Sequence, residues 1–235
     1  MKQNTCLINK MRVTAVLTAV AAVISGCSVT DVIPSNNMPQ NQGQGQPNSV
    51  VIEAYESSET ATTTSLYMAT ENLDFSNFVF IGDSRTVGLA SCVDIETIAE
   101  VGVGYSFLQQ HYNEIIELHD KNIVFNLGVN DLTHVDSYIE FFQRLPEDFT
   151  FDNHIYVVSV NPTSGPYAGM NQDIDYFNVQ LADSLPSTCK WIDTCSFLRE
   201  AGFGTSDGLH YDQTTYETIA NLIYNNVMLY QQMGY

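Results

Sequence analysis

Two segments of the sequence carry residue types that suit nucleophilic catalysis. Ser84 follows Asp83 directly after an apolar run, and a serine at such a strand-to-helix turn projects its hydroxyl into a crevice. His210 lies near the end of the chain, three residues after Asp207. A histidine ionises near neutral pH and can act as a general base, and a carboxylate at this spacing can reach its Nδ1–H. Taken alone, a Gly-Asp-Ser turn that caps a helix is ordinary structure.

Two further segments offer hydrogen-bond donors without charge. Gly102 or Gly104 can present an unobstructed backbone N–H to an oxyanion. A dinucleotide-binding loop is excluded there, because Gly-x-Gly-x-x-Gly would need a glycine at position 107, which holds phenylalanine. Asn130 can offer its side-chain amide, although an Asn-Asp pair is more ordinarily a loop or a helix cap. We expect Asp131 to cap the segment that follows it.

These four segments lie where strands end or where the last helix begins. Apolar runs predict strands at 78–81, 98–103, 122–127, 155–160 and 191–193, and helical spacing predicts helices at 107–118, 138–145, 174–185 and 214–231. Strands that alternate with helices indicate a parallel sheet covered on both faces. Such folds bind their ligands outside the carboxyl ends of the strands, which is where three of the four segments fall, while the fourth precedes the last helix.

In order and spacing, the four segments resemble the motif blocks of the SGNH (GDSL-like) hydrolase family over about residues 75–235. The matching residues are Gly82-Asp83-Ser84, Gly104, Gly128-Val129-Asn130-Asp131 and Asp207-Gly208-Leu209-His210. The resemblance implies an α/β fold of three layers, α/β/α, with a central, mostly parallel five-stranded sheet of flavodoxin-like type. It implies Ser84 as the nucleophile, His210 as the base and Asp207 as its partner. The Ser84 N–H, the Gly104 N–H and the Asn130 side chain would form the oxyanion hole.

The sequence departs from the family pattern at two positions. Arg85 stands where the name-giving motif has leucine, so it either pairs with one of the many acids or binds a polar or anionic part of the substrate. The second block lacks the residue that often precedes its glycine, which keeps Gly102 as an alternative to Gly104. Tyr105 is a further candidate for substrate contact, because an aromatic ring can stack on a sugar.

The N-terminal third of the chain is expected to serve as an address and a spacer. Residues 1–26 combine three basic residues with an apolar run too short to span a bilayer, as in a signal peptide. Small residues precede Cys27, which resembles a bacterial lipobox and predicts lipidation of that cysteine; an ordinary secretory signal is the alternative. The Gln/Asn- and Ser/Thr-rich segment 27–73 reads as a flexible tether before a hydrolase domain at 74–235. We therefore expect an extracytoplasmic protein that a lipid holds at the cell membrane.

Composition and cysteine spacing limit the ligands that the chain can bind and the disulfides that it can form. The chain has 8 basic and 27 acidic residues and a formal net charge of −19, which excludes a basic surface for nucleic acid or an anionic membrane. No HExxH motif or Cys/His cluster occurs, so we expect neither a metal nor a cofactor. Cys189 and Cys195 flank an apparent strand, which keeps them too far apart for a disulfide. Pairing of Cys92 with either one stays open, and buried free thiols are the favoured interpretation.

The function that the sequence favours is ester hydrolysis through an acyl-enzyme, most of all deacetylation of a carbohydrate. Alternatives are O-acetyl transfer to a glycan, a lysophospholipase or thioesterase activity, or a non-catalytic surface-tethered binding module of the same fold. The expected partner is an acylated carbohydrate or another small ester, and we expect a monomer.

Overall fold

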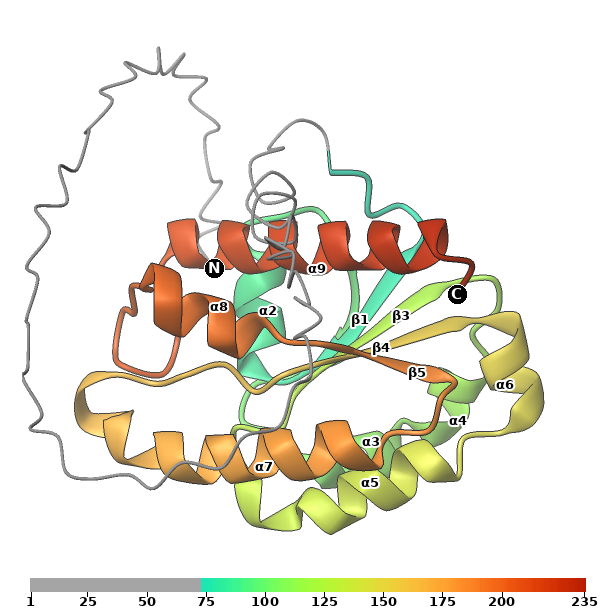
Figure 1. Ribbon diagram of the computed structural model, residues 1–235, viewed down its shortest axis with the longest axis horizontal. Coiled ribbons are helices and arrows are strands. Elements are labelled where there is room, and N and C mark those ends of the chain that lie inside the picture. Colours follow the sequence, from blue (N-terminus) through green and yellow to red (C-terminus); the bar gives the residue numbers. More distant parts are fainter. Residues whose placement is uncertain (1–72) are drawn as a thin grey trace, which may run out of the picture. The chain divides into compact units, whose positions relative to one another are not determined.

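The computed structural model of the protein describes residues 73–235 (Figure 1). The predicted signal peptide 1–26 and the lipidation of Cys27 lie outside the described residues, as does the tether apart from its last residue. These predictions therefore stay predictions. Within the described residues, no helix is long and apolar enough to cross a membrane.

Five parallel strands form one sheet in the order β2-β1-β3-β4-β5. The strands are β1 (Phe78–Gly82), β2 (Glu96–Ala99), β3 (Asn122–Asn126), β4 (His154–Val158) and β5 (Cys189–Ile192). All pairs being parallel, every carboxyl end lies at one edge, where Gly82 of β1 pairs with Ala99 of β2 and with Asn126 of β3. The order reverses between β1 and β3, which makes the end of these two strands the switch point where flavodoxin-like sheets bind ligands.

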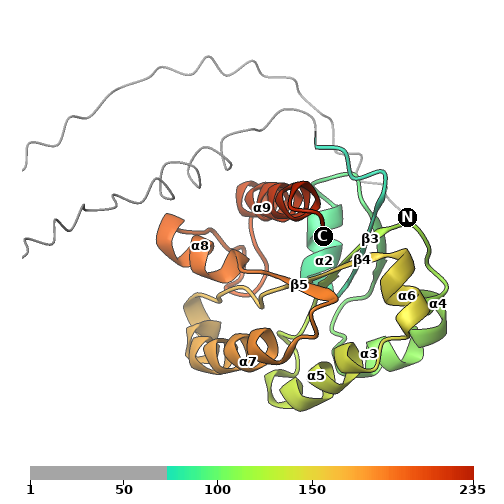
Figure 2. The same ribbon diagram turned by 45° about the vertical axis from the view of Figure 1, so that its right-hand side comes forward.

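Helices cover both faces of the sheet, which confirms the three-layer α/β/α fold (Figures 1 and 2). One face carries α2 (Ser84–Ala90), α8 (Thr194–Ala201) and α9 (Gln213–Gln232). The other carries α3 (Tyr105–Gln110), α4 (Tyr112–Ile116), α5 (Val135–Gln143), α6 (Glu147–Asp152) and α7 (Asn171–Ser184). Two 3₁₀ turns, η1 (Leu132–His134) and η2 (Gly165–Met170), follow β3 and β4.

Alternation along the strands divides the core into two. Phe78 and Phe80 of β1 pack in the cluster that includes α9, whereas Val79 and Ile81 pack in the cluster on the opposite face. Successive side chains of a strand point to opposite faces, and all four of these are at most 2% exposed. The continuous apolar runs in the sequence thus reflect strands that are buried on both sides.

The sequence expectations differ from the structure mainly at element boundaries. The helix expected at 107–118 is two helices, because the backbone at His111 leaves the helical region with φ −97° and ψ 8°. The strand expected at 98–103 ends at Ala99, since the chain turns at Gly102, where φ is +79°. Helices α6 and α8 were not expected, being only six and eight residues long with few periods to read.

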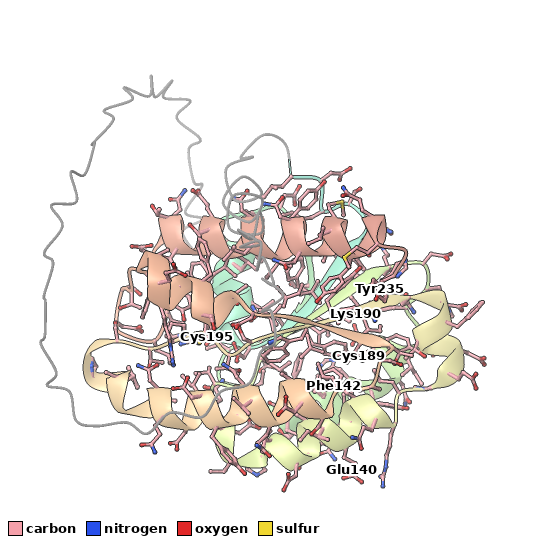
Figure 3. All side chains as sticks on the ribbon, viewed as in Figure 1. Glu140, Phe142, Cys189, Lys190, Cys195 and Tyr235 are labelled. Carbon is pink, nitrogen blue, oxygen red and sulfur yellow. The ribbon has the colours of Figure 1, made fainter. Side chains whose placement is uncertain are left out.

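All three cysteines of the described residues are free thiols. Cys189 starts β5 and Cys195 lies in α8, well apart along this segment (Figure 3). Both side chains are buried, and burial raises the pKa of the Cys189 thiol to about 12 and that of Cys195 to about 11. The expectation of unpaired, buried thiols is confirmed for these two, while Cys92 is half-buried and pairs with neither.

Candidate active site

Ser84, His210 and Asp207 come together at the carboxyl edge of the sheet. The Oγ atom of Ser84 lies 3.0 Å from Nε2 of His210, and Nδ1 of His210 lies 2.7 Å from Oδ2 of Asp207. Both imidazole nitrogens are thereby engaged, which fixes a tautomer with its proton on Nδ1 and a lone pair facing the serine. Residues 126 positions apart in the sequence form this row. The arrangement matches a nucleophile, its base and the carboxylate that orients the base.

Close packing after β1 sets the position of Ser84. A Cβ atom added at Gly82 would lie 2.5 Å from the Asn126 carbonyl oxygen and would overlap Thr86, so only glycine lets β1 approach these groups. Asp83 is the N-cap of α2, and its Oδ1 accepts a hydrogen bond of 2.9 Å from the Arg85 N–H. Ser84 is then the first residue of α2 and is 7% exposed. The backbone that carries the nucleophile is therefore fixed by the close packing at Gly82 before it and by the Asp83 cap of α2.

Asp83 is itself a buried carboxyl group beside the nucleophile. It is 1% exposed, and its Oδ2 atom has no hydrogen-bond partner within the described residues. Burial raises the pKa of Asp83 to about 6, although the Arg85 backbone N–H and the Arg85 charge oppose this shift. Protonation of Asp83 is thus expected in mildly acidic solution, close to the proposed nucleophile.

A short loop, residues 205–211, carries the base and its partner, and we call it the His210 loop. An antiparallel bridge between Thr205 and Tyr211 closes it. Within it, Oδ1 of Asp207 accepts the backbone N–H groups of Leu209 at 2.8 Å and of His210 at 2.7 Å. These bonds and the imidazole contact hold the pKa of Asp207 well below its usual value. Asp207 is therefore ionised at neutral pH and can stabilise a protonated His210.

The expected oxyanion donors lie at the ends of β1, β2 and β3. Asn130 donates one amide hydrogen to the Val103 carbonyl at 2.7 Å, which leaves its second hydrogen for a ligand. No acceptor within residues 73–235 takes the backbone N–H of Ser84 or of Gly104. Gly102 is exposed with open space around its Cα, whereas Gly104 adjoins the Val103 peptide that Asn130 contacts. This geometry favours Gly104 over Gly102.

Asp131 has a role that differs from the one expected. Its carboxylate does not cap η1, the segment that follows it. Instead, Oδ2 accepts the Tyr105 N–H at 2.6 Å, at the start of α3, and Oδ1 accepts the Tyr138 hydroxyl at 2.8 Å. Burial and the nearby Asp131 charge raise the pKa of Tyr138 far above its ordinary value, so that hydroxyl stays a donor. Asp131 thus joins the loop after β3 to the Gly104 backbone.

Arg85 does not occupy the substrate-binding position expected from the sequence. Its side chain is buried, at 4% exposure, and forms no ion pair with a carboxylate of the described residues. Its donors face the backbone carbonyls of Leu209, Asn161 and Pro162 instead. Both interpretations of Arg85 drawn from the sequence, an acid partner and a substrate anion, are therefore wrong. The contacts link elements too distant in the chain for any local pattern to reveal.

Tyr105 is half-buried beside Gly104. Its ring packs edge-on against Tyr138 with centroids 5.5 Å apart. It also lines an open pocket of about 420 Å³ together with Gln109, Tyr112, Glu140, Phe141 and Arg144. Contact of Tyr105 with a substrate stays a prediction.

Two other histidines also have carboxylate partners. His111 contacts Glu114 at 2.7 Å, and His119 contacts Asp152 at 3.1 Å. Neither pair includes a serine hydroxyl, so the Ser84 contact, rather than the carboxylate, distinguishes His210. Within the described residues, no group of His, Cys, Asp or Glu side chains is arranged to hold a metal ion.

Comparison with known proteins identifies the fold. No family model and no curated protein matches the chain. Among solved structures, a GDSL-like lipase from Bacteroides thetaiotaomicron aligns with a TM-score of 0.53 at 17% identity, over 73% of this chain and 97% of its own. A protein described as an acylhydrolase from Bacteroides fragilis aligns with a TM-score of 0.52 at 17% identity, over 78% of this chain and 100% of its own. The described part of the chain therefore has the SGNH (GDSL-like) hydrolase fold.

Proposed function

We propose that the domain is a serine ester hydrolase that works through an acyl-enzyme. The observation that carries this proposal is the row from Ser84 Oγ through His210 to Asp207, with distances of 3.0 and 2.7 Å. His210 Nε2 takes the Ser84 proton while Oγ forms a bond to the ester carbonyl carbon. Asp207, ionised at neutral pH, stabilises the imidazolium that results.

The developing oxyanion is held by three donors. These are the Ser84 N–H, the Gly104 N–H and the amide hydrogen of Asn130 that the Val103 carbonyl does not take. When the tetrahedral intermediate collapses, the bond to the leaving alcohol breaks and His210 gives its proton to that alcohol. Water then attacks the acyl-enzyme with His210 again as the base, which releases the acid and restores Ser84.

Exposure of the base favours hydrolysis over transfer to a glycan. The His210 side chain is 36% exposed and that of Asp207 is 51% exposed. A transferase must keep water from its acyl-enzyme, whereas an open His210 loop admits water to the base. Acyl transfer, lysophospholipid or thioester hydrolysis and a non-catalytic role remain the alternatives that product analysis separates.

For the substrate, we propose an acetylated carbohydrate at the cell envelope. The lipobox-like sequence at Cys27 and the polar segment after it support a surface-tethered protein, and Tyr105, directly after Gly104, offers an aromatic ring on which a sugar can stack. If a Cys27→Ala variant still incorporates radiolabelled palmitate, Cys27 is not the lipidated residue and the lipid anchor is removed from this proposal.

The test is an ester panel on the purified protein. Ser84→Ala should abolish hydrolysis of p-nitrophenyl acetate and labelling by a fluorophosphonate. Acetate release from an acetylated polysaccharide should exceed fatty-acid release from a lysophospholipid. A wild-type protein that folds but neither hydrolyses any ester nor labels at Ser84 would refute the activity and favour the binding module.

A further inference from the structure

The His210 loop is exposed where its catalytic pair lies, yet its C-terminal end reaches the buried interior. The side chain of Asp207 is half exposed, whereas Tyr211 is 4% exposed. An exposed loop tends to move unless it is tied down. The ties that hold this loop therefore decide how well His210 is aligned with Ser84.

Arg85 supplies a tie on the N-terminal side of His210. Its Nε donates to the carbonyl of Leu209, the residue directly before His210, at 3.0 Å. Arg85 is fixed in turn, because its own N–H donates to the buried Asp83 carboxyl in the first turn of α2. The same short segment thus carries the nucleophile, Ser84, and the side chain that grips the loop of the base.

Arg85 also contacts the residue on the C-terminal side of His210. Its guanidinium carbon lies 4.9 Å from the centre of the Tyr211 ring, a cation–π distance. The Tyr211 hydroxyl donates to the Pro162 carbonyl at 2.5 Å. His210 is therefore bracketed by two residues that Arg85 touches.

The remaining donors of Arg85 bond to the loop after β4, residues 159–164, which we call the platform. Nη1 donates to the Asn161 carbonyl at 2.7 Å, and Nη2 lies 3.4 Å from the Pro162 carbonyl. The Asn161 side chain accepts the Thr194 hydroxyl at 2.6 Å, and both residues are at most 3% exposed. A planar guanidinium can bond several carbonyls at fixed angles, which neither leucine nor lysine can do.

Loop and platform also meet directly at Gly208. The Ser164 N–H donates to the Gly208 carbonyl at 2.8 Å, and Gly208 has φ +94° with the Ser164 carbonyl 2.5 Å from where a Cβ would lie. This contact closes the loop onto the platform but does not reach Ser84. Among these ties, Arg85 alone belongs to the segment that bears the nucleophile.

We propose that Arg85 is a positioning residue that locks the His210 loop to the Ser84 segment and to the loop after β4, so that Nε2 stays aligned with Ser84 Oγ. The kinetic part of this proposal rests on the proposed hydrolase function. It assigns Arg85 no contact with substrate, which separates it from the anion-binding role that the sequence suggested.

The experiment compares Arg85→Leu and Arg85→Lys with the wild type on p-nitrophenyl acetate. A misplacement of about 1 Å can cost on the order of 10²-fold in rate, so kcat of Arg85→Leu should fall by about that factor with KM changed less than about threefold. Fluorophosphonate labelling of Ser84 should slow equally, because it needs the base but no recognition of substrate. Arg85→Lys, which can bond only one or two of the carbonyls, should recover part of the rate.

Arg199→Leu is the matched control, since it removes the same charge from an arginine of α8 that pairs with Asp175 of α7. It should leave kcat unchanged. A folded Arg85→Leu with kcat within twofold of wild type, or with a raised KM and unchanged kcat, overturns the proposal. If Arg85→Leu fails to fold, Arg85→Lys carries the test, and a wild-type kcat in that variant overturns it.

A measurement without substrate separates this proposal from the proposed function. In ¹⁵N spectra of the histidine rings, the Nε2 resonance of wild-type His210 should show its hydrogen bond with Ser84 Oγ, and in Arg85→Leu or Arg85→Lys it should shift toward that of an imidazole nitrogen without this bond while His111 keeps its signal. Loss of the Nε2 hydrogen bond in a protein that hydrolyses no ester would sustain the positioning role and refute the activity. An unchanged His210 signal in both variants would refute the positioning role whatever the activity.

Discussion

Gly104→Ala tests whether the loop after β2 has room for any side chain. A Cβ at this position would lie 2.5 Å from Cγ of Asp131, whereas ordinary contacts begin near 3.4 Å. The Asp131 carboxylate must therefore retreat by about 1 Å. That movement stretches its bonds to the Tyr105 N–H and the Tyr138 hydroxyl, now 2.6 and 2.8 Å. Hydrogen bonds to a charged group contribute about 1.5–3 kcal/mol each, so the free energy of unfolding should fall by about 2–4 kcal/mol.

Urea unfolding followed by the fluorescence of Trp191, the only tryptophan of the chain, measures this loss. Gly169→Ala is the control, because a Cβ there has no neighbour within 4 Å, and it should change stability by less than about 0.5 kcal/mol. In an Asp131→Ala background the clash is absent, so Gly104→Ala should then cost much less. Equal costs in both backgrounds, or a cost below 0.5 kcal/mol in the wild type, would refute the steric argument. Activity should fall with stability, by about 10-fold or more, because the Gly104 N–H moves with its backbone.

The remaining predictions concern the triad, the oxyanion and the buried acid. Asn130→Ala should lower kcat by about 10²–10³ with little change in KM, and an unchanged rate would remove Asn130 from the oxyanion hole. Asp207→Asn should lower kcat by on the order of 10²–10⁴, because the His210 proton moves to the nitrogen that faces Ser84; steady-state kinetics at pH 7 measures it. The pKa of Asp83 is raised to about 6, so the folded protein holds an extra proton between about pH 4 and 6 and loses stability as pH rises through this window. Asp83→Asn should remove about 3 kcal/mol of this pH dependence. Urea unfolding at a series of pH values from 4 to 8 measures it, and the prediction is contradicted if the free energies of unfolding of variant and wild type change with pH in the same way.

The sequence was sufficient to predict the sheet because each central strand is a continuous apolar run. The expected strands overlap β1, β3 and β4 by four or five residues, and β2 and β5 by two residues each. The expected strand 98–103 begins two residues after the start of β2, because this edge strand is half exposed and has no continuous apolar run. Short helices such as α6 offered too few turns for a helical period. Burial on both faces is thus what made an element visible in the sequence.

The site was predictable where residue type and function coincide. A serine after β1 and an Asp-x-x-His segment before α9 have side chains whose chemistry limits their use, and both reach the positions expected of them. Arg85 and Asp131 were misjudged because their partners are backbone groups. A carbonyl or an N–H exists at almost every residue, so no sequence feature marks Leu209 or Tyr105 as the partner.

The acidity of the chain explains why Arg85 must be buried to hold the His210 loop. Only five basic residues follow residue 26, and the exposed arginines and Lys121 pair with carboxylates: Arg144 with Glu140, Arg199 with Asp175 and Lys121 with Glu96. An exposed arginine near the site would meet one of the 27 acids in the same way. The Arg85 side chain is instead enclosed among neutral carbonyls and the Tyr211 ring, where no carboxylate of the described residues forms an ion pair with it.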